Sequence, residues 1–485
     1  MTEMPESGHD FERLAEEISG QVRQRVVVAR WFGDKDRDMR SVTMEDLAIE
    51  SVGQGQAGWA VALVTFSDGD EARYGIPFVV RNGLAISDSA DDPLFSTWWI
   101  ESAGGRRIET WKGGALEFRP FPWAGDSLGK ASKQDGSVLQ VEQSNTSIRY
   151  GDVALAKVFR RLSQGMNPEI EITVRLAAQP NPIRIASPLA EVVYRGQRGE
   201  ESVGFFQRWV PNVGDGWSWT RSALNDLLMD PSGSRANAMA NRSDVIAAYL
   251  LLGQRTGELH RGLAEAGEDT AFSPLLLTEE MVGAQIQQSV AGLEQTMILL
   301  TAFAERTGVL RDEIAAVQRG AEHLRERLNG MNALVGTFAI RVHGDYHLGQ
   351  VLRTTDGDWT ILDFEGEPAR PIEERRRKYP AMKDVGGMLR SFAYARGAAL
   401  RTSAHRGIAL PEDTLQPWET EAKSSFVEGY RSAVDGCAMP IVPAGDTQFG
   451  SAMDAWELDK ALYEVRYELA NRPEWLYLPL AALKV

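Results

Sequence analysis

The chain has 485 residues, enough for roughly three domains of about 150 residues each. Its composition, 43% hydrophobic and 25% charged, is ordinary for a soluble globular protein. The net charge of −16 argues against a partner with a phosphate backbone, so no nucleic-acid binding is expected. A single cysteine, Cys437, excludes an internal disulfide framework and every multi-cysteine metal site.

The ends and the apolar stretches of the chain predict its location. Residues 1–6 are acidic, without the basic segment and apolar core of a secretory signal. The longest apolar stretches, at 246–252 and 297–304, are far shorter than the ~20 residues that cross a membrane. We therefore expect a cytoplasmic protein with no membrane partner.

The first third of the chain is predicted to be rich in strands. Residues 10–29 carry apolar side chains at helical spacing and predict an amphipathic helix. Strand patterns extend over about 45–120, where 59–66 and 73–80 flank a Ser-Asp-Gly-Asp turn and predict a β-hairpin. Residues 121–138, rich in Gly, Ser, Lys and Asp, predict a loop.

The rest of the chain changes from strands to helices. A second β-rich block with one helix is expected at 139–212, and strand-like residues at 338–343 and 360–364 interrupt the helices that follow. The predicted helices span 236–264, 278–306, 309–329, 414–434 and 451–471. The pattern predicts an α+β protein with two lobes and an N-terminal addition.

Three parts follow from this order. They are an N-terminal β-rich cap subdomain at 1–95, a β-rich intermediate subdomain at 96–212, and a large helical C-terminal lobe at 213–485.

The segment from His343 to Asp363 carries the strongest chemical signal. Its residues read His-Gly-Asp345, then Gln350 five positions later, then a strand that ends at Asp363-Phe-Glu. Phosphoryl transfer needs one carboxylate to accept a proton and separate oxygens to hold magnesium, and kinases place such groups at this spacing. The pattern favours phosphoryl transfer over acids that merely end a hairpin. His343 is expected to hydrogen-bond the loop, and His347 is left open.

A second signal lies in the β-rich block, where a strand ends at Lys157. Asn167 and Pro168 then open a helix that carries Glu169 and Glu171 in its first turn. Lys157 is predicted to pair with Glu171, or with Glu169, and a solvated surface pair is the alternative. The polar turn before the strand could hold phosphates through backbone N–H and hydroxyl groups. Its candidate residues are Gln143, Ser144, Asn145, Thr146 and Ser147.

The last long helix presents a polar and aromatic face. Lys460, Tyr463, Glu464, Tyr467 and Asn471 recur at helical spacing. Two tyrosines with a lysine offer a flat apolar surface and donors, which suits a polyhydroxylated sugar. The alternative is a tyrosine stripe that packs into the core.

These motifs together resemble the maltokinase family, within the bilobal aminoglycoside-phosphotransferase and protein-kinase-like fold. The resemblance covers nearly the whole chain. The matching segments are 30–33, 142–147, 157–161, 167–168, 342–345, 347–353, 363–368, 374–376, 384–385, 389–392, 457–468 and 472–475.

The resemblance implies transfer of the ATP γ-phosphate to the anomeric hydroxyl of maltose. The product, maltose 1-phosphate, would serve α-glucan (glycogen) and trehalose metabolism, and trehalose synthase is an implied partner. Asp345 would then be the base, Gln350 and Asp363 would bind Mg²⁺, and Lys157 would contact the nucleotide phosphates. The implied substrate contacts are Lys460, Tyr463 and Tyr467, with His343 kept as a further candidate.

Two other functions stay open on the sequence. The same fold could phosphorylate glucosamine or another sugar, an aminoglycoside, or choline. Lys460 argues against a cationic substrate, whereas the nearby Glu464 and Glu468 keep glucosamine in view. A non-catalytic adaptor is the second alternative, and the presence of both Asp345 and Asp363 argues against it.

Overall fold

The chain forms two compact units in a computed structural model, which describes residues 8–139, 144–229, 235–265, 269–367, 370–408, 410–411 and 413–484. The first unit comprises Met1–Ala178 and Ala186–Pro211, and the second comprises Gln179–Ile185 and Asn212–Val485. Apart from the connector Gln179–Ile185 and Asn212, both predicted N-terminal subdomains fall within the first unit. The three-part division therefore stays a prediction about subdomains.

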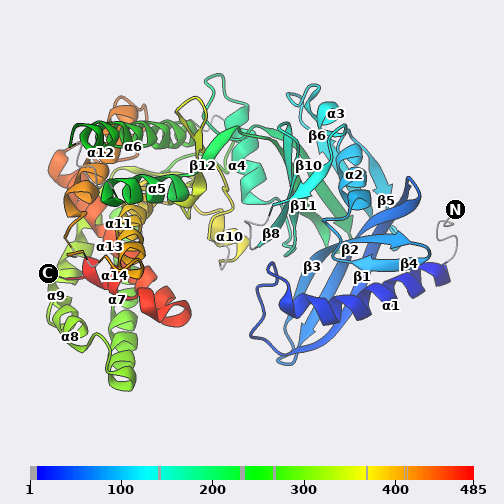
Figure 1. Cartoon of the computed structure of the whole chain (residues 1–485), viewed down its shortest axis with the longest axis horizontal. Coiled ribbons are helices and arrows are strands. Elements are labelled where there is room, and N and C mark those ends of the chain that lie inside the picture. Colours follow the sequence, from blue (N-terminus) through cyan, green and yellow to red (C-terminus); the bar gives the residue numbers. More distant parts are fainter. Residues whose placement is uncertain are drawn as a thin grey trace. The chain divides into compact units, whose positions relative to one another are not determined.

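An antiparallel four-stranded sheet begins the first unit (Figure 1). Its strands, in spatial order, are β1 (Met39–Val52), β2 (Gly55–Phe66), β3 (Glu71–Arg81) and β4 (Leu84–Ser87). Helix α1 (Gly8–Arg25) packs its apolar face, which includes the buried Leu14 and Ile18, on this sheet. The structure thus contains the predicted N-terminal helix and the predicted hairpin.

A seven-stranded antiparallel sheet completes the first unit. Its order is β5 (Arg107–Glu109), β6 (Ala115–Pro120), β10 (Pro188–Gly196), β11 (Gly199–Arg208), β9 (Ala154–Phe159), β8 (Asn145–Tyr150) and β7 (Gly136–Val138). Helix α4 (Pro168–Ala177) packs beside β10. Many buried residues of the sheet form a core with Trp98 and Trp99, while Phe159 and Phe205 pack with Ile170 of α4.

Two segments of the first unit differ from the sequence prediction. Helix α2 (Pro93–Ser102) stands where strands were expected, because Asp92 caps it by accepting the Leu94 N–H and Pro93 fits its first turn. Its residues are buried on several sides, which hides the helical period. The expected loop at 121–138 contains helix α3 (Ser127–Ala131) and strand β7.

The second unit is mostly helical. Its main helices are α5 (Gly216–Met229), α6 (Arg235–Ala264), α7 (Glu279–Thr307), α8 (Arg311–Arg319), α9 (Ala321–Leu328), α11 (Met382–His405), α12 (Gln416–Val434), α13 (Asp446–Asn471) and α14 (Tyr477–Ala482). The predicted helices correspond to α6, α7, α12 and α13, and the one at 309–329 is divided into α8 and α9 at Gly320. Helix α11 was not predicted. Most of its residues are buried, so it lacks the polar face that reveals a surface helix.

The strands of the second unit pair differently from the prediction. Strand β14 (Phe338–Ala339) pairs with β13 (Leu275–Leu276), while β15 (Val351–Thr354) and β16 (Trp359–Ile361) form a hairpin flanked by β12 (Asn212–Asp215). The expected strand at 338–343 ends early. Beyond Ile340, which pairs with Tyr379, the backbone of this segment bonds to a helix side chain, described below.

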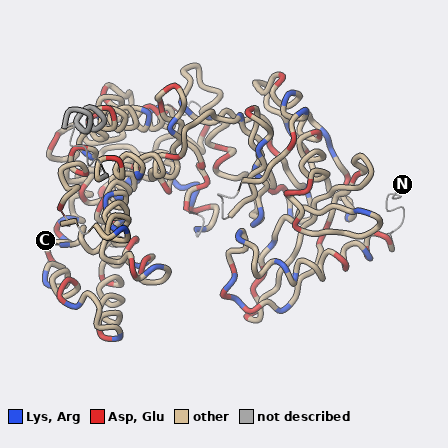
Figure 2. Tube along the Cα trace, viewed as in Figure 1, with Lys and Arg blue, Asp and Glu red and all other residues tan. Residues whose placement is uncertain are grey.

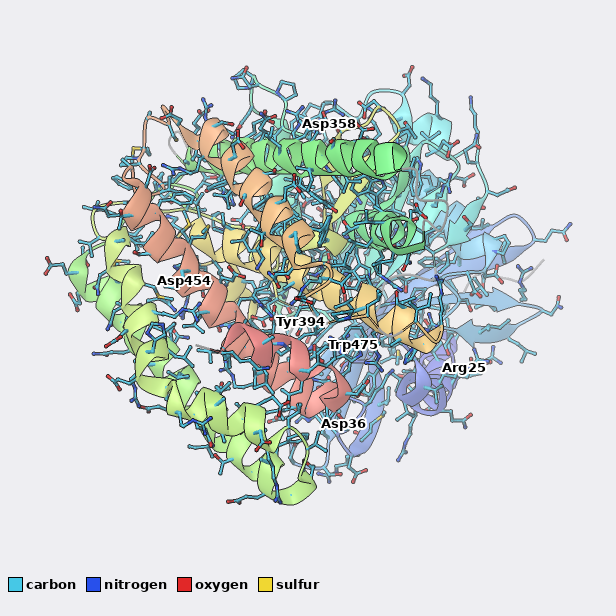
Figure 3. All side chains as sticks on the ribbon, turned by 60° about the vertical axis from the view of Figure 1, so that its left-hand side comes forward. Arg25, Asp36, Asp358, Tyr394, Asp454 and Trp475 are labelled. Carbon is cyan, nitrogen blue, oxygen red and sulfur yellow. The ribbon has the colours of Figure 1, made fainter. Side chains whose placement is uncertain are left out.

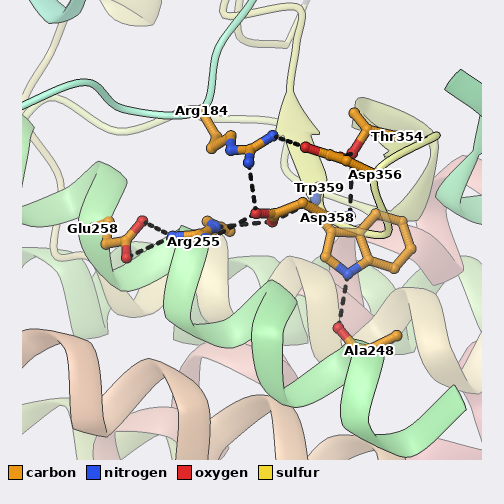
Figure 4. A network of polar contacts seen from close by, with 8 residues as sticks. All are labelled: Arg184, Ala248, Arg255, Glu258, Thr354, Asp356, Asp358 and Trp359. Atoms are coloured by element: carbon orange, nitrogen blue, oxygen red, sulfur yellow. Dashed lines mark hydrogen bonds and ion pairs between the residues drawn. The ribbon is translucent and has the colours of Figure 1, made fainter. Parts of the chain in front are cut away.

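The connector Gln179–Ile185 is fastened to the strand that leads to Asp363 (Figure 4). The Ile361 N–H donates to the Arg184 carbonyl at 2.9 Å. The Arg184 guanidinium lies 2.9 Å from Asp356 and 3.1 Å from Asp358, and Arg255 binds Asp358 at 2.7 Å. The backbone hydrogen bond joins β16 directly to the connector.

Charged residues of both signs are interspersed along both units, as Figure 2 shows. Within the described ranges, no helix combines the length and the apolar character needed to cross a bilayer.

Candidate active site

The loop that carries Asp345 is held by a buried carboxylate. Asp384, in the first turn of α11, accepts the N–H of His343 at 2.7 Å and the N–H of Gly344 at 2.9 Å. His260 Nε2 lies 3.1 Å from the same carboxylate. Burial raises the pKa of Asp384, but the hydrogen bond and charge of His260 and the Gly344 N–H outweigh it and hold the pKa below its ordinary value. The ionised Asp384 therefore fixes the loop.

His343 is packed inside the loop. It is 1% exposed, and its Nε2 donates to the Leu362 carbonyl at 2.8 Å. Its ring lies 5.1 Å from the ring of Phe364. The hydrogen bond to Leu362 agrees with the expected contact of His343 with the loop, and its assignment as a substrate contact stays a prediction.

Asp345 faces Lys460 of α13. The Lys460 Nζ lies 3.4 Å from Asp345 Oδ1. Burial raises the pKa of the Asp345 carboxyl, but the charge of Lys460, with smaller contributions from His347 and His343, keeps the pKa below its ordinary value. The carboxylate is therefore ionised at neutral pH, as a general base requires.

Gln350 and Asp363 are in direct contact. The Gln350 Nε2 donates to Asp363 Oδ2 at 2.9 Å, and the Leu362 N–H donates to the Gln350 carbonyl at 2.9 Å. Asp363 has φ +64°, a left-handed conformation that is uncommon for a residue other than glycine. The structure thus brings the two predicted magnesium ligands together at the end of β16.

Glu365 adds a third oxygen donor that the sequence analysis missed. A carboxylate oxygen of Glu365 and one of Asp363 lie within 4.8 Å of each other. The carboxylates of Asp363 and Glu365 offer oxygens that suit a hard divalent cation, and Gln350, whose amide Nε2 contacts Asp363, lies beside them. The Asp-Phe-Glu motif contained the signal, but its second acid was not assigned a role.

His347 lies within electrostatic reach of both Asp345 and Asp363. Its Nδ1 accepts the Gly349 N–H at 3.0 Å, which caps the short 3₁₀-helix Leu348–Gln350. Burial lowers the pKa of His347, and the charge of Asp345 only partly opposes this. His347 is therefore neutral at physiological pH and holds the turn between the two acids.

The tyrosines of α13 form a stacked pair beside Lys460. The rings of Tyr463 and Tyr467 have centroids 6.4 Å apart and an interplanar angle of 24°. Lys460 Nζ lies 4.8 Å from the Tyr463 ring centroid, and Tyr467 is 44% exposed. Glu464, on the same helix, is buried against Arg390 at 2.8 Å. The predicted sugar-binding face thus begins at Asp345 and is open at Tyr467.

In the first unit, Lys157 pairs with Glu169. Its Nζ lies 2.9 Å from Oε1 and 3.0 Å from Oε2, and the two side chains are only 4% and 1% exposed. The Asn167 side chain caps α4 by accepting the Glu169 N–H at 2.8 Å, and this places Glu169 toward β9. The partner is thus Glu169, the alternative to Glu171, and the pair is buried rather than solvated.

The expected phosphate-binding turn is partly a strand. Gln143 lies outside the described residues, Ser144 precedes β8, and Asn145, Thr146 and Ser147 belong to β8, which pairs with β9. The Thr146 hydroxyl accepts a hydrogen bond from the buried Arg160 at 2.8 Å. The pairing of β8 with β9 explains why this segment is a strand and not a turn, because its backbone groups hydrogen-bond to the neighbouring strand.

Comparison with known proteins finds sugar kinases. The glucosamine kinase of Mycolicibacterium smegmatis (strain ATCC 700084) is 27% identical over 358 residues, which cover 71% of this chain and 78% of the relative. The glucosamine kinase of Streptacidiphilus jiangxiensis is 26% identical over 352 residues, 70% of each chain. No family model matches the sequence.

Solved structures of glucosamine kinase share the fold. Crystal form B gives a TM-score of 0.68 at 20% identity and covers 97% of this chain and 98% of that chain. The complex with glucosamine, ADP and inorganic phosphate gives 0.66 at 20% identity, with the same coverage. The predicted α+β fold of the protein-kinase-like class, with a β-rich N-terminal region and a helical C-terminal lobe, is confirmed.

Proposed function

We propose that this protein is an ATP-dependent kinase that phosphorylates a hydroxyl group of a small sugar. The observation that carries the proposal is the ionised Asp345, 3.4 Å from Lys460 and in a loop fixed by Asp384. A carboxylate in this state can accept the proton of an attacking hydroxyl. The two glucosamine kinase relatives support the same class of reaction.

In the proposed reaction, the acceptor hydroxyl attacks the γ-phosphorus of ATP. Its proton passes to Asp345, the bond to the bridging oxygen breaks, and ADP leaves. Gln350, Asp363 and Glu365 would hold Mg²⁺, whose charge would neutralise the phosphates. Lys157, oriented by Glu169, would contact the nucleotide phosphates, with Ser144, Asn145, Thr146 and Ser147 as further candidates.

Glucosamine is the acceptor that we propose first, because both sequence relatives are glucosamine kinases. Glu367 contributes to this preference: its carboxylate, which pairs with Arg370, also interacts with the Tyr463 side chain, so an acid lies beside the sugar-binding face. Lys460 offers no net repulsion to an ammonium group, since its charge is paired with Asp345.

Maltose is the second candidate. The stacked Tyr463 and Tyr467 extend the sugar-binding face away from Asp345, which suits a second sugar ring. The resemblance to maltokinases supports the same acceptor. It also predicts an association with trehalose synthase, which co-purification of the two proteins would test.

A substrate panel separates these acceptors. The full-length chain is incubated with ATP, Mg²⁺ and glucosamine, maltose or glucose, and ³¹P NMR identifies the phosphorylated product. Glucosamine as the preferred acceptor by kcat/KM supports the first assignment, and maltose supports the second. ATP hydrolysis without any sugar phosphate would overturn the proposed function.

A further inference from the structure

A cavity lies in the helical unit, between α5, α11 and the end of α13. Its volume is about 470 Å³, within the range of small-molecule sites. Trp217 and Arg221 of α5 line it, together with Tyr394 and Arg401 of α11. Trp475, which follows α13, lines the same cavity, and Figure 3 shows it near Tyr394.

The cavity is cationic although the chain is strongly acidic. Arg221, Arg401, Arg472 and His405 line it, and none of its lining residues is Asp or Glu. Arg472 is neutralised by Glu468 at 2.7 Å. Among the described residues, Arg221 and Arg401 form no ion pair, and the buried Nε of Arg221 and Nη1 of Arg401 have no hydrogen-bond partner. Two guanidinium groups therefore retain unused donors.

The arginines are combined with aromatic faces. The Arg401 guanidinium lies 4.7 Å from the ring centroid of Trp475, and Arg221 lies 6.0 Å from that of Trp217. Stacking on an indole holds a guanidinium in place while its N–H groups stay available for an anion. An apolar indole face beside the N–H donors of a guanidinium suits a ligand that has both a ring and an anionic group.

The cavity is separate from Asp345. Lys460 lies in α13 and Arg472 directly follows its last residue, 12 positions later, which corresponds to about 18 Å. Asp384 and Arg401 are 17 positions apart on α11, or about 25 Å. Arg472 lies 5.4 Å from the Tyr467 ring centroid, so the cavity adjoins the far end of the sugar-binding face.

We propose that this cavity is a second binding site, which takes a phosphorylated sugar. Its phosphate would bind Arg221 and Arg401, and its ring would pack on Trp475. The group bound in this cavity is either a separate sugar phosphate or the distal part of a long, anionic acceptor whose other end lies at Asp345.

Calorimetric titration of the full-length Asp345→Asn chain without ATP tests the site independently of catalysis. The probes are glucose 6-phosphate, inorganic phosphate and glucose. We expect glucose 6-phosphate to bind one site per chain, more tightly than either other probe. Arg401→Gln and Arg221→Gln should each lower the affinity for glucose 6-phosphate about tenfold or more. The exposed Arg319→Gln, which makes the same change of charge outside the cavity, should leave the affinity unchanged.

Trp475→Leu should lower the affinity for glucose 6-phosphate and leave the affinity for inorganic phosphate unchanged. A titration in the presence of saturating maltose identifies the source of the ligand: unchanged affinity indicates a separate sugar phosphate, and competition indicates the distal part of an acceptor. The proposal is overturned if glucose 6-phosphate does not bind, or if both arginine variants, made in the Asp345→Asn chain, bind it as the Asp345→Asn chain does.

Discussion

The ammonium group of Lys460 lies 3.4 Å from the carboxylate of Asp345, although the two residues are 115 positions apart. The contact connects the loop after β14 to the face of α13 that carries the stacked tyrosines. It places a proton acceptor at one end of a surface suited to sugars, which joins the chemistry of the site to its specificity.

Lys460→Met should shift the acid limb of kcat to higher pH. Burial raises the pKa of Asp345 and Lys460 makes the largest contribution against it, so removing the lysine leaves only the smaller contributions of His347 and His343 and raises the pKa. The base is then protonated, and activity lost, at a higher pH than in the unmodified chain. A pH–rate profile measures the shift. Lys460→Arg keeps the positive charge, so the acid limb should stay at the pH of the unmodified chain. An acid limb at the same pH in Lys460→Met and in the unmodified chain would contradict the assignment of Asp345 as the base.

Asp384→Ala should lower kcat and destabilise the second unit. The N–H groups of His343 and Gly344 would lose their acceptor, at a cost of about 1–3 kcal/mol for each buried donor. Asp384→Asn keeps one oxygen acceptor and should cost less. Urea unfolding and steady-state kinetics measure both effects. If Asp384→Ala changed neither stability nor kcat, the carboxylate would not hold the loop.

Lys157→Met and Glu169→Leu should each destabilise the first unit by about 3–5 kcal/mol, because each removes one charge of a buried ion pair. The double variant should lose less than the sum of the two. Arg107→Met is the control: its exposed side chain pairs with Glu109 and Glu117 at the surface, and the change should cost less than about 1 kcal/mol. Additive losses in the double variant would show that the pair is not coupled.

Asp363→Asn should raise the Mg²⁺ concentration needed for half-maximal activity, because it removes a charged ligand beside Gln350. Asp356→Asn is the matched control, since Asp356 is a surface acid of the same hairpin that binds Arg184 and not the proposed metal. Initial rates over a magnesium titration provide the measurement. A response of Asp356→Asn equal to that of Asp363→Asn would contradict the proposed ligand set.

Local patterns in the sequence were enough to find the central residues. Asp345, Gln350 and Asp363 lie within 19 positions, on a loop and a hairpin whose spacing is visible in the chain. The cap at Asn167 was predictable for the same reason, because an N-cap depends on the next few residues.

What the sequence did not reveal depends on contacts between distant residues. Asp384 binds a backbone about 40 positions away, so no local pattern marks its role. The choice of Glu169 over Glu171 follows from the packing of α4 against the sheet, which spacing alone left open. Helix α11 was missed because burial on nearly all sides removed its amphipathic signal.

The most direct test of the account is sugar phosphorylation by Asp345→Asn, followed by ³¹P NMR with ATP, Mg²⁺ and glucosamine or maltose. The substitution keeps the size of the side chain and removes its ability to accept a proton. The account predicts that kcat falls by at least about a hundredfold while the thermal midpoint is little changed. Sugar phosphate formed at the rate of the unmodified chain would show that Asp345 is not the base.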